Sequence, residues 1–170
     1  MAFEQTVPHI HTDAAEGMRD VSERRAATIA NMIDEAKKRG IDDSFAYDAI
    51  AAYGAENAEA DRKNMKNPDD FKEFSSMFGS DLSRELYEME RVVDTDDELE
   101  IAFHYCPYVN KWVKQGRTPE EIAHLCEITM AGDHEYAKHF PCCNFKLEGT
   151  IADGNPVCTL RFTRNPDFQK

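Results

Sequence analysis

The sequence contains no long hydrophobic run. Its apolar stretches are short, as in Ile101-Ala102-Phe103, whereas a helix needs about 20 apolar residues to cross a bilayer. The first residues, MAFEQTVPHIHTDAAEG, also lack the basic and apolar regions of a secretion signal. We therefore expect no membrane association, and we expect the protein to reside in the cytoplasm.

Positive charge is scarce as well. The 170 residues include 33 Asp and Glu against 20 Lys and Arg, and the formal net charge is −13. Residues 106–170 contain eight of each sign, so the excess of acid lies wholly in the first 105 residues. Nucleic acid and anionic membranes both require a cationic face on a protein that binds them. Neither is expected as a partner, and a small-molecule substrate is the expected ligand.

Common catalytic motifs are also missing. The sequence has no glycine-rich phosphate-binding loop, no G-x-S-x-G turn and no HExxH helix, so kinase, α/β-hydrolase and common metalloprotease functions have no support. Its five cysteines are an odd number in a chain without a secretion signal. That combination favours free or metal-bound thiols over a disulfide framework.

The length is that of one domain. A chain of 170 residues, 41% of them hydrophobic, buries roughly 70% of its unfolded surface. We expect a single domain over residues 1–170, with a loose arm over 1–12, a helical part over 13–80 and a sheet-and-helix part over 81–170 that carries the candidate site.

The apolar spacing predicts an α+β fold. Helical periodicity predicts three N-terminal helices. The first runs from Asp13 to Arg39, the second from a cap at Asp42 or Asp43 to Asn67-Pro68, and the third, a shorter one, starts with Asp69 and Asp70. Alternating apolar residues predict two hairpins, made of Leu86–Val93 with Glu98–Tyr105 and of Asn144–Ile151 with Val157–Thr163. Between them, Pro107 opens one helix and a capping box at Thr118 opens another. The helices pack on an antiparallel sheet of about four strands, with two helices between the two hairpins.

His104 and Cys106 are the first candidate site residues. They are two residues apart at a strand end, so if the strand persists both side chains face the same way, about 7 Å apart. A histidine beside a thiol can hold it as the nucleophilic thiolate, or both can bind zinc. The alternative is a histidine on the solvent side of the sheet and a cysteine that fills a small space in the core.

Asp133 is the second candidate. Seven residues separate it from Cys126, so on a continuous helix both lie on the face expected to meet the core, where a carboxylate is costly unless paired. Alternatively, Asp133 follows Gly132 as the cap of a new helix. Cys158 alternates with Leu160 and Phe162, which packing explains.

The remaining thiols and histidines have weaker patterns. Cys142 and Cys143 are expected to be loop thiols, and His9 and His11 lie in the arm, where such a pair can pick up metal incidentally.

A series of short motifs follows in a distinctive order: Cys106-Pro107, Leu125-Cys126-Glu127, Gly132-Asp133, Phe140-Pro141, Thr150-Ile151-Ala152-Asp153-Gly154 and Cys158-Thr159-Leu160-Arg161-Phe162. This order resembles the L-2-amino-thiazoline-4-carboxylic acid hydrolase family. The likeness covers residues 106–170 and the preceding strand. The first half of the chain resembles the family only in being helical. In the resemblance, Cys106, Cys126, Asp133 and Cys158 occupy the pattern positions.

The resemblance implies hydrolysis of a carbon-nitrogen bond in a cyclic amidine, which opens 2-aminothiazoline-4-carboxylate toward carbamoyl-cysteine. We assign Cys106 as nucleophile and Asp133 as the group that orients or exchanges protons, with Cys126 and Cys158 lining the pocket. His104 joins them as the base on strand geometry alone. No cofactor is expected, although in a variant Cys106, His104 and Cys126 bind zinc that activates water.

Two questions stay open at this level. Arg91, Arg161 and Arg164 are each available to bind a substrate carboxylate, and nothing in the sequence ranks them. A non-catalytic module of the same fold, which holds a small ligand or a metal as a sensor or partner-binding domain, is the alternative function.

Overall fold

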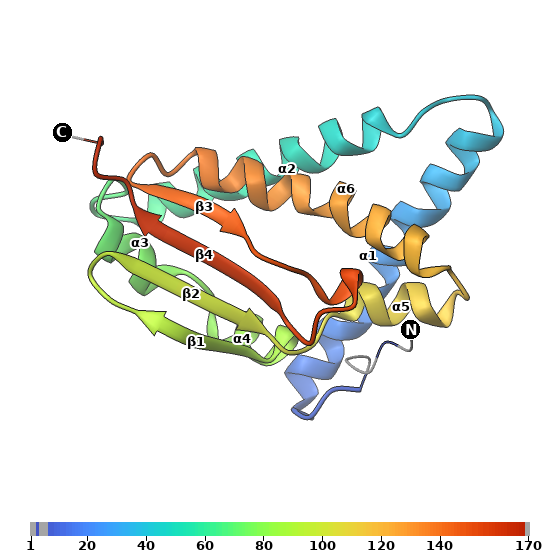
Figure 1. Ribbon diagram of the computed structural model, residues 1–170, viewed down its shortest axis with the longest axis horizontal. Coiled ribbons are helices and arrows are strands. Elements are labelled where there is room, and N and C mark those ends of the chain that lie inside the picture. The colour runs from blue at the N-terminus through green and yellow to red at the C-terminus, as the bar shows by residue number, and fades with distance from the viewer. Residues whose placement is uncertain (1–2, 4–6, 169–170) are drawn as a thin grey trace.

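The chain folds into helices that flank one antiparallel sheet (Figure 1). The computed structural model describes residue 3 and residues 7–168. Residues 1–2, 4–6 and 169–170, and with them part of the expected arm, lie outside the described residues.

In the described part of the chain the first half forms four helices, three of them where the apolar spacing predicts. The Thr12 hydroxyl accepts a hydrogen bond from the Ala15 N–H at 3.1 Å and starts the first helix. The Asp70 carboxylate caps the third helix in the same way. The helices are α1 (Asp13–Lys38), α2 (Ser44–Asn64), α3 (Phe71–Met77) and α4 (Asp81–Tyr87).

The prediction of a strand from Leu86 onward is wrong at its start, because residues 81–87 form the helix α4. The Ser80 hydroxyl accepts from the Ser83 N–H at 3.2 Å, and Glu88 ends the helix with a φ of 51°. Seven residues are too few for a helical period to stand out in the sequence. The strand begins at Met89 instead.

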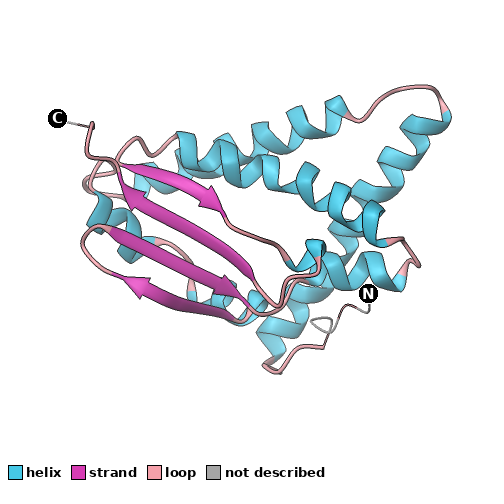
Figure 2. Ribbon diagram, viewed as in Figure 1, coloured by secondary structure: helices cyan, strands magenta, loops and turns pink. Residues whose placement is uncertain are grey.

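The sheet has the strand order β1-β2-β4-β3, and all its pairs are antiparallel. Figure 2 shows the two hairpins side by side, with β2 and β4 in the middle. Leu99 pairs with Phe162 and Ile101 with Leu160, which puts the apolar side chains on the face that meets the helices. The strands are β1 (Met89–Asp94), β2 (Glu98–Phe103), β3 (Cys143–Leu147) and β4 (Cys158–Arg164). The expected α+β class and four-stranded sheet are confirmed.

Two helices connect the hairpins. Pro107 is the first residue of α5 (Pro107–Lys114), and the capping box formed by Thr118 and Glu121 opens α6 (Pro119–Lys138). α6 continues through Gly132 without a break. No helix in the described part of the chain is both long enough and apolar enough to span a membrane.

α2 and α6 pack side by side along most of their length (Figure 1). Their backbones meet at two glycines: a Cβ placed on Gly54 would lie 2.2 Å from the carbonyl oxygen of Gly132. Only glycine permits so close an approach. This contact fixes the position of α6 relative to α2.

Buried side chains form two apolar cores. The first, around Phe74, Phe140 and Phe162, lies between the sheet, α3 and the end of α6. The second, around Trp112 and Ile128, joins α1, α5 and the first half of α6. Cys158 packs against both cores, so the two meet at that residue.

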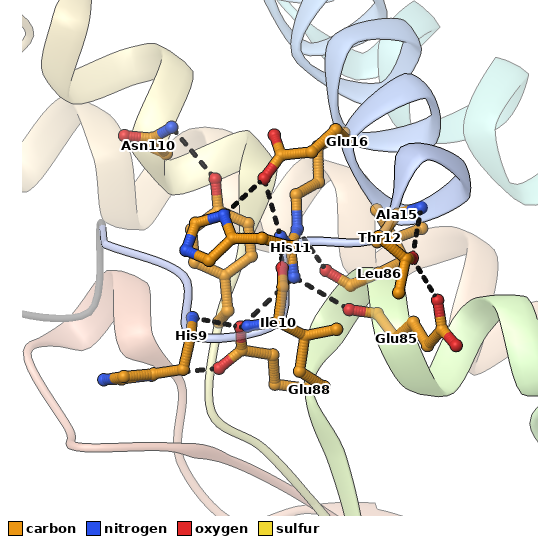
Figure 3. A network of polar contacts seen from close by, with 12 residues as sticks. His9, Ile10, His11, Thr12, Ala15, Glu16, Glu85, Leu86, Glu88 and Asn110 are labelled. Atoms are coloured by element: carbon orange, nitrogen blue, oxygen red, sulfur yellow. Dashed lines mark hydrogen bonds and ion pairs between the residues drawn. The ribbon is translucent and has the colours of Figure 1, made fainter.

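The described end of the arm is anchored rather than loose (Figure 3). The Glu88 carboxylate accepts hydrogen bonds from the backbone N–H groups of His9 at 2.5 Å and Ile10 at 2.8 Å. Arg19 pairs with the same carboxylate at 3.2 Å. Burial alone would raise the pKa of Glu88, but these donors hold it below its ordinary value. The arm is thus tied to the junction of α4 and β1.

Candidate functional site

The first candidate thiol lies where β2 leads into α5. The strand ends at Phe103, and Cys106 is the N-terminal cap of α5, directly before Pro107. Burial raises the pKa of the Cys106 thiol, while the N–H groups of Val109 and Tyr108 oppose that rise. The thiol is therefore protonated at rest, and the helix N-terminus can stabilise the thiolate when it forms.

α6 carries two candidates on one face. Cys126 and Asp133 lie two turns apart on a helix that is continuous between them. Burial raises the pKa of Cys126, and Cys106 and Cys158 add to the rise, whereas a hydrogen bond with Thr150 opposes it. The alternative in which Asp133 caps a new helix is excluded, because α6 does not restart there.

A tight turn positions the last candidate thiol. The Thr150 hydroxyl accepts from the Asp153 N–H at 3.1 Å, and Gly154 takes a φ of 85°, which glycine adopts at little cost. The turn contains the short 3-10 helix η2 (Ile151–Asp153). It brings the Ile151 N–H to 3.2 Å from the Cys158 sulfur, and burial raises the pKa of that thiol to about 12.

These four side chains converge on one region although they come from the β2–α5 corner, α6 and β4. Cys106 and Cys158 each affect the pKa of Cys126, and Asp133 affects those of Cys106 and Cys158. The three cysteines also pack against the same apolar core, the one that contains Trp112. The sequence spacing had placed only Cys126 and Asp133 together.

Asp133 is exposed although protein atoms closely surround its carboxyl group, and we call the solvent-accessible space beside it the recess. Its side chain retains solvent-accessible surface, and yet burial raises its pKa from 3.8 to about 6, which its own backbone N–H and the charge of Arg25 only partly offset. A carboxylate can be both accessible and strongly desolvated when protein surrounds a space large enough for water. A carboxyl group with such a pKa can take up or release a proton near neutral pH.

Two phenols face the same recess. Burial raises the pKa of Tyr108 to about 12 and that of Tyr87 well above 10, and both groups respond to the charges of Cys106 and Asp133. Within the described residues, neither hydroxyl has a protein hydrogen-bond partner. Every buried side-chain polar atom described does have a partner, so these two hydroxyls must be accessible to solvent. They can therefore bind a ligand. Sequence reasoning missed both, because only the fold turns them inward.

The structure does not bring His104 to Cys106. The His104 ring lies on the exposed face of the sheet, 3.0 Å from Glu90. The strand ends at Phe103, so the alternation that would have put His104 and Cys106 on one face stops before Cys106. Asp133, and not His104, is the ionisable side chain whose charge reaches the Cys106 thiol.

The three thiols do not form a metal centre with His104. Among the described residues, no group of three or more His, Cys, Asp or Glu side chains is arranged to hold a metal ion. All five cysteines are free, and Cys142 and Cys143 are buried rather than in an exposed loop, with Cys143 starting β3.

A surface groove of about 650 Å³ runs beside α6. Cys126 and Thr150 form part of its wall. Its lining also includes four carboxylates, one lysine and two histidines: Asp48, Glu127, Glu135, Asp153, Lys138, His124 and His134. Carboxylates thus outnumber the lysine, which makes the groove a poorer environment for an anionic group than a cationic surface would be.

The arginines considered from the sequence are committed elsewhere. Arg91 pairs with Asp94, and Arg164 with Asp97. Arg161 binds three glutamates on the exposed face of the sheet, Glu98, Glu100 and Glu148. None of the three lies free beside the thiol cluster.

A family model described as L-2-amino-thiazoline-4-carboxylic acid hydrolase matches residues 19–162. The match includes the helical first half as well as the cysteine-bearing part. No curated protein matches the sequence.

Among solved structures, the fold is similar to that of a trafficking protein particle complex subunit 3 from Naegleria fowleri covalently bound to palmitic acid. The TM-score is 0.53 at 14% sequence identity, and the likeness covers 89% of this chain and 99% of the other. At that identity the comparison establishes a shared fold only.

Proposed function

Because the chain belongs to the L-2-amino-thiazoline-4-carboxylic acid hydrolase family, we propose that it hydrolyses a carbon-nitrogen bond of a small cyclic amidine such as 2-aminothiazoline-4-carboxylate. The observation that carries the proposal is the convergence of Cys106, Cys126, Asp133 and Cys158 on one recess. Packing alone gives no reason for a desolvated carboxylate to lie near the thiols of Cys106 and Cys158.

Cys106 acts as the nucleophile. Its sulfur attacks the ring carbon between sulfur and nitrogen, and its proton passes to Asp133, directly or through one water. The ring nitrogen then leaves with a proton returned by Asp133, which leaves the amidine carbon bound to Cys106. Water attacks that carbon, the Cys106 sulfur leaves as the thiol, and the product is a carbamoyl-cysteine.

Asp133 fits the role of base and acid because its pKa is about 6. A group that exchanges protons twice in one turnover works best when its pKa lies near the working pH. The N–H groups at the start of α5 stabilise the Cys106 thiolate as it develops. His104 has no part in these steps, because it lies with Glu90 on the exposed face of the sheet.

Replacement of the nucleophile tests the proposal. Cys106→Ser keeps a good helix cap, so the fold should survive. We expect kcat/KM for 2-aminothiazoline-4-carboxylate to fall by at least about 10³-fold. Cys142→Ala, which removes a buried thiol from the other core, is the matched control and should keep its activity. A Cys106→Ser enzyme with the wild-type rate would show that Cys106 is not the nucleophile.

A non-catalytic ligand-binding module is the second candidate. The raised pKa values of Cys106 and Cys158 favour it, because a thiol that stays neutral at neutral pH is a poor nucleophile. Thiol alkylation and metal analysis on reduced protein separate the two. One fast-reacting cysteine without metal supports the hydrolase, whereas stoichiometric zinc with unreactive thiols supports the module or a zinc-dependent variant of the hydrolase.

A further inference from the structure

Among the described arginines, Arg25 is unusual in having no carboxylate partner. It lies on α1 and is exposed. Within the described residues, Arg25 and Arg39 are the two arginines that make no ion pair, and Arg39 lies at the far end of α1 as its C-terminal cap. Arg25 is therefore the unpaired guanidinium along the length of that helix.

A tyrosine holds the Arg25 guanidinium in place. Its Cζ atom lies 4.4 Å from the centre of the Tyr53 ring on α2, a cation–π contact between the first two helices. Such stacking restricts the arginine side chain and leaves the edge of the guanidinium, with its N–H groups, free to bind a planar anion. The Tyr53 side chain is itself 44% exposed, so the stacked pair lies at the protein surface.

Helix contacts place the guanidinium near Asp133. Arg25 stacks on Tyr53, and the next residue, Gly54, meets the backbone of Gly132, which precedes Asp133. In keeping with this, the charge of Arg25 lowers the pKa values of Asp133, Tyr108 and Tyr87. Arg25 and Asp133 nevertheless form no ion pair, so space remains between them. The groove beside Cys126, by contrast, has more carboxylates than lysine or arginine side chains in its lining. The sign of the charge thus favours the Arg25 side for an anionic group.

We propose that Arg25, held by Tyr53, binds the carboxylate of the substrate at the mouth of the recess and so places the amidine ring between Asp133 and Cys106. This inference rests on the proposed function, and it adds the residue that selects a carboxylated ring. A bidentate contact between guanidinium and carboxylate would orient the ring as well as bind it.

Two substrates test the inference: 2-aminothiazoline-4-carboxylate and 2-aminothiazoline, the same ring without the carboxylate. In Arg25→Met we expect kcat/KM for the carboxylated ring to fall by roughly 10- to 100-fold, the range for loss of one charged hydrogen-bonded contact. The rate with the ring that lacks the carboxylate should not change. Arg25→Lys keeps the charge but loses the planar guanidinium group. Its kcat/KM for the carboxylated ring should lie between those of the wild type and Arg25→Met.

Arg24→Met is the matched control. Arg24 is the next residue on α1, is exposed and pairs with Asp20 on the same helix. Its replacement should leave both substrates unaffected. Equal losses on both rings in Arg25→Met, or a similar loss in Arg24→Met, would overturn the assignment of the carboxylate to Arg25 while the hydrolase proposal stands.

Binding separates failure of the inference from failure of the proposed function. The Kd of the carboxylated ring is measured by calorimetry in Cys106→Ala protein, with and without Arg25→Met. If the wild type opens neither ring, the hydrolase proposal is overturned. In that case, a Kd raised roughly 10-fold or more by Arg25→Met would still assign a carboxylate site to Arg25. A Kd that Arg25→Met leaves unchanged would overturn the carboxylate site as well.

The pH profile provides a readout that a purely structural role would not move. Ionisable groups from several elements surround the Asp133 carboxyl: Arg25, Tyr87, Cys106, Tyr108, Tyr136 and Cys158. Arg25 is the cation among them, and its removal must raise the pKa of Asp133. The acidic limb of kcat/KM should therefore move to higher pH in Arg25→Met, and a limb that stays in place would contradict the proximity on which the inference depends.

Discussion

At the residue scale, the side chain that most needs an explanation is Asp133. A carboxylate whose pKa is raised by burial makes the folded state less stable wherever it is ionised. The protein nevertheless places one near two thiols, those of Cys106 and Cys158, and near the phenols of Tyr87 and Tyr108. Stability given up at one position in exchange for activity is a recurring feature of active sites.

We predict that Asp133→Asn stabilises the protein at neutral pH. The folded-state pKa is about 6 and the ordinary value is 3.8. Below pH 3.8 the group is neutral in both the folded and the unfolded state, so the substitution should change nothing there. Above pH 6 the wild type carries the cost of a desolvated charge. Because water reaches the side chain, we expect a gain of about 1 kcal/mol, with loss of hydrolysis.

Urea unfolding at several pH values measures this effect. Asp43→Asn is a control of opposite sign, because a hydrogen bond from His124 lowers the pKa of Asp43 and its replacement should reduce stability at neutral pH. An Asp133→Asn protein that is less stable than wild type at pH 7 would show that the carboxylate has a favourable partner.

At the element scale, short structures at chain corners bring the site together. Cys106 faces α6 because β2 ends before it and α5 begins after it. Cys158 is fixed by the turn around η2. The crossing of α2 and α6 then sets where Cys126 and Asp133 lie along the recess. Each of these features depends on a residue with little freedom to change, such as Pro107, Gly154 or Gly54.

We predict that Gly54→Ala destabilises the protein by about 2 kcal/mol or more. The new methyl group would lie 2.2 Å from the Gly132 carbonyl oxygen, so α2 and α6 must move apart. This cost should exceed the gain of about 1 kcal/mol that alanine brings in a helix.

Gly17→Ala provides the matched control. Gly17 is also in a helix, and a Cβ there would meet nothing within 4 Å. We expect it to stabilise the protein by about 0.5–1 kcal/mol. The free energies of unfolding of the two variants, obtained from urea titrations, should therefore have opposite signs relative to wild type. Changes of the same sign would mean that the helix crossing is not rigid.

At the scale of the whole molecule, repulsion between the excess negative charges destabilises the folded state. The net charge of −13 comes from the first 105 residues, which include all of α1, α2, α3 and α4. Ion pairs offset part of the repulsion, but most lie at the surface, where each contributes little.

We predict that salt stabilises this protein at neutral pH. Raising NaCl from about 20 mM to about 300 mM shortens the Debye length well below the width of the molecule, and we expect Tm to rise by about 2–5 °C. Near pH 4.8, the pI of the sequence, the same addition should have little effect. Thermal melts monitored by circular dichroism measure both, and a Tm that falls with salt at neutral pH would show that ion pairs outweigh the repulsion.

Local patterns were sufficient to predict most of the elements. The start of α3 at Asp70, the capping box at Thr118 and the alternation in β2 and β4 depend on neighbours within a few residues, and each is formed as expected. α4 was missed because seven residues show too little periodicity. The pairing of β2 with β4, which joins the two hairpins, follows from the need to bury both apolar faces.

The sequence by itself determined the fold class, the four positions of the family pattern and the single face of α6 that carries Cys126 and Asp133, because all of these depend on composition or on spacing along one element. Only the tertiary structure decided that His104 pairs with Glu90, that Asp133 is the charged neighbour of Cys106, and that Arg25 lies near Asp133. These relations join residues far apart in the chain, and packing between elements sets them.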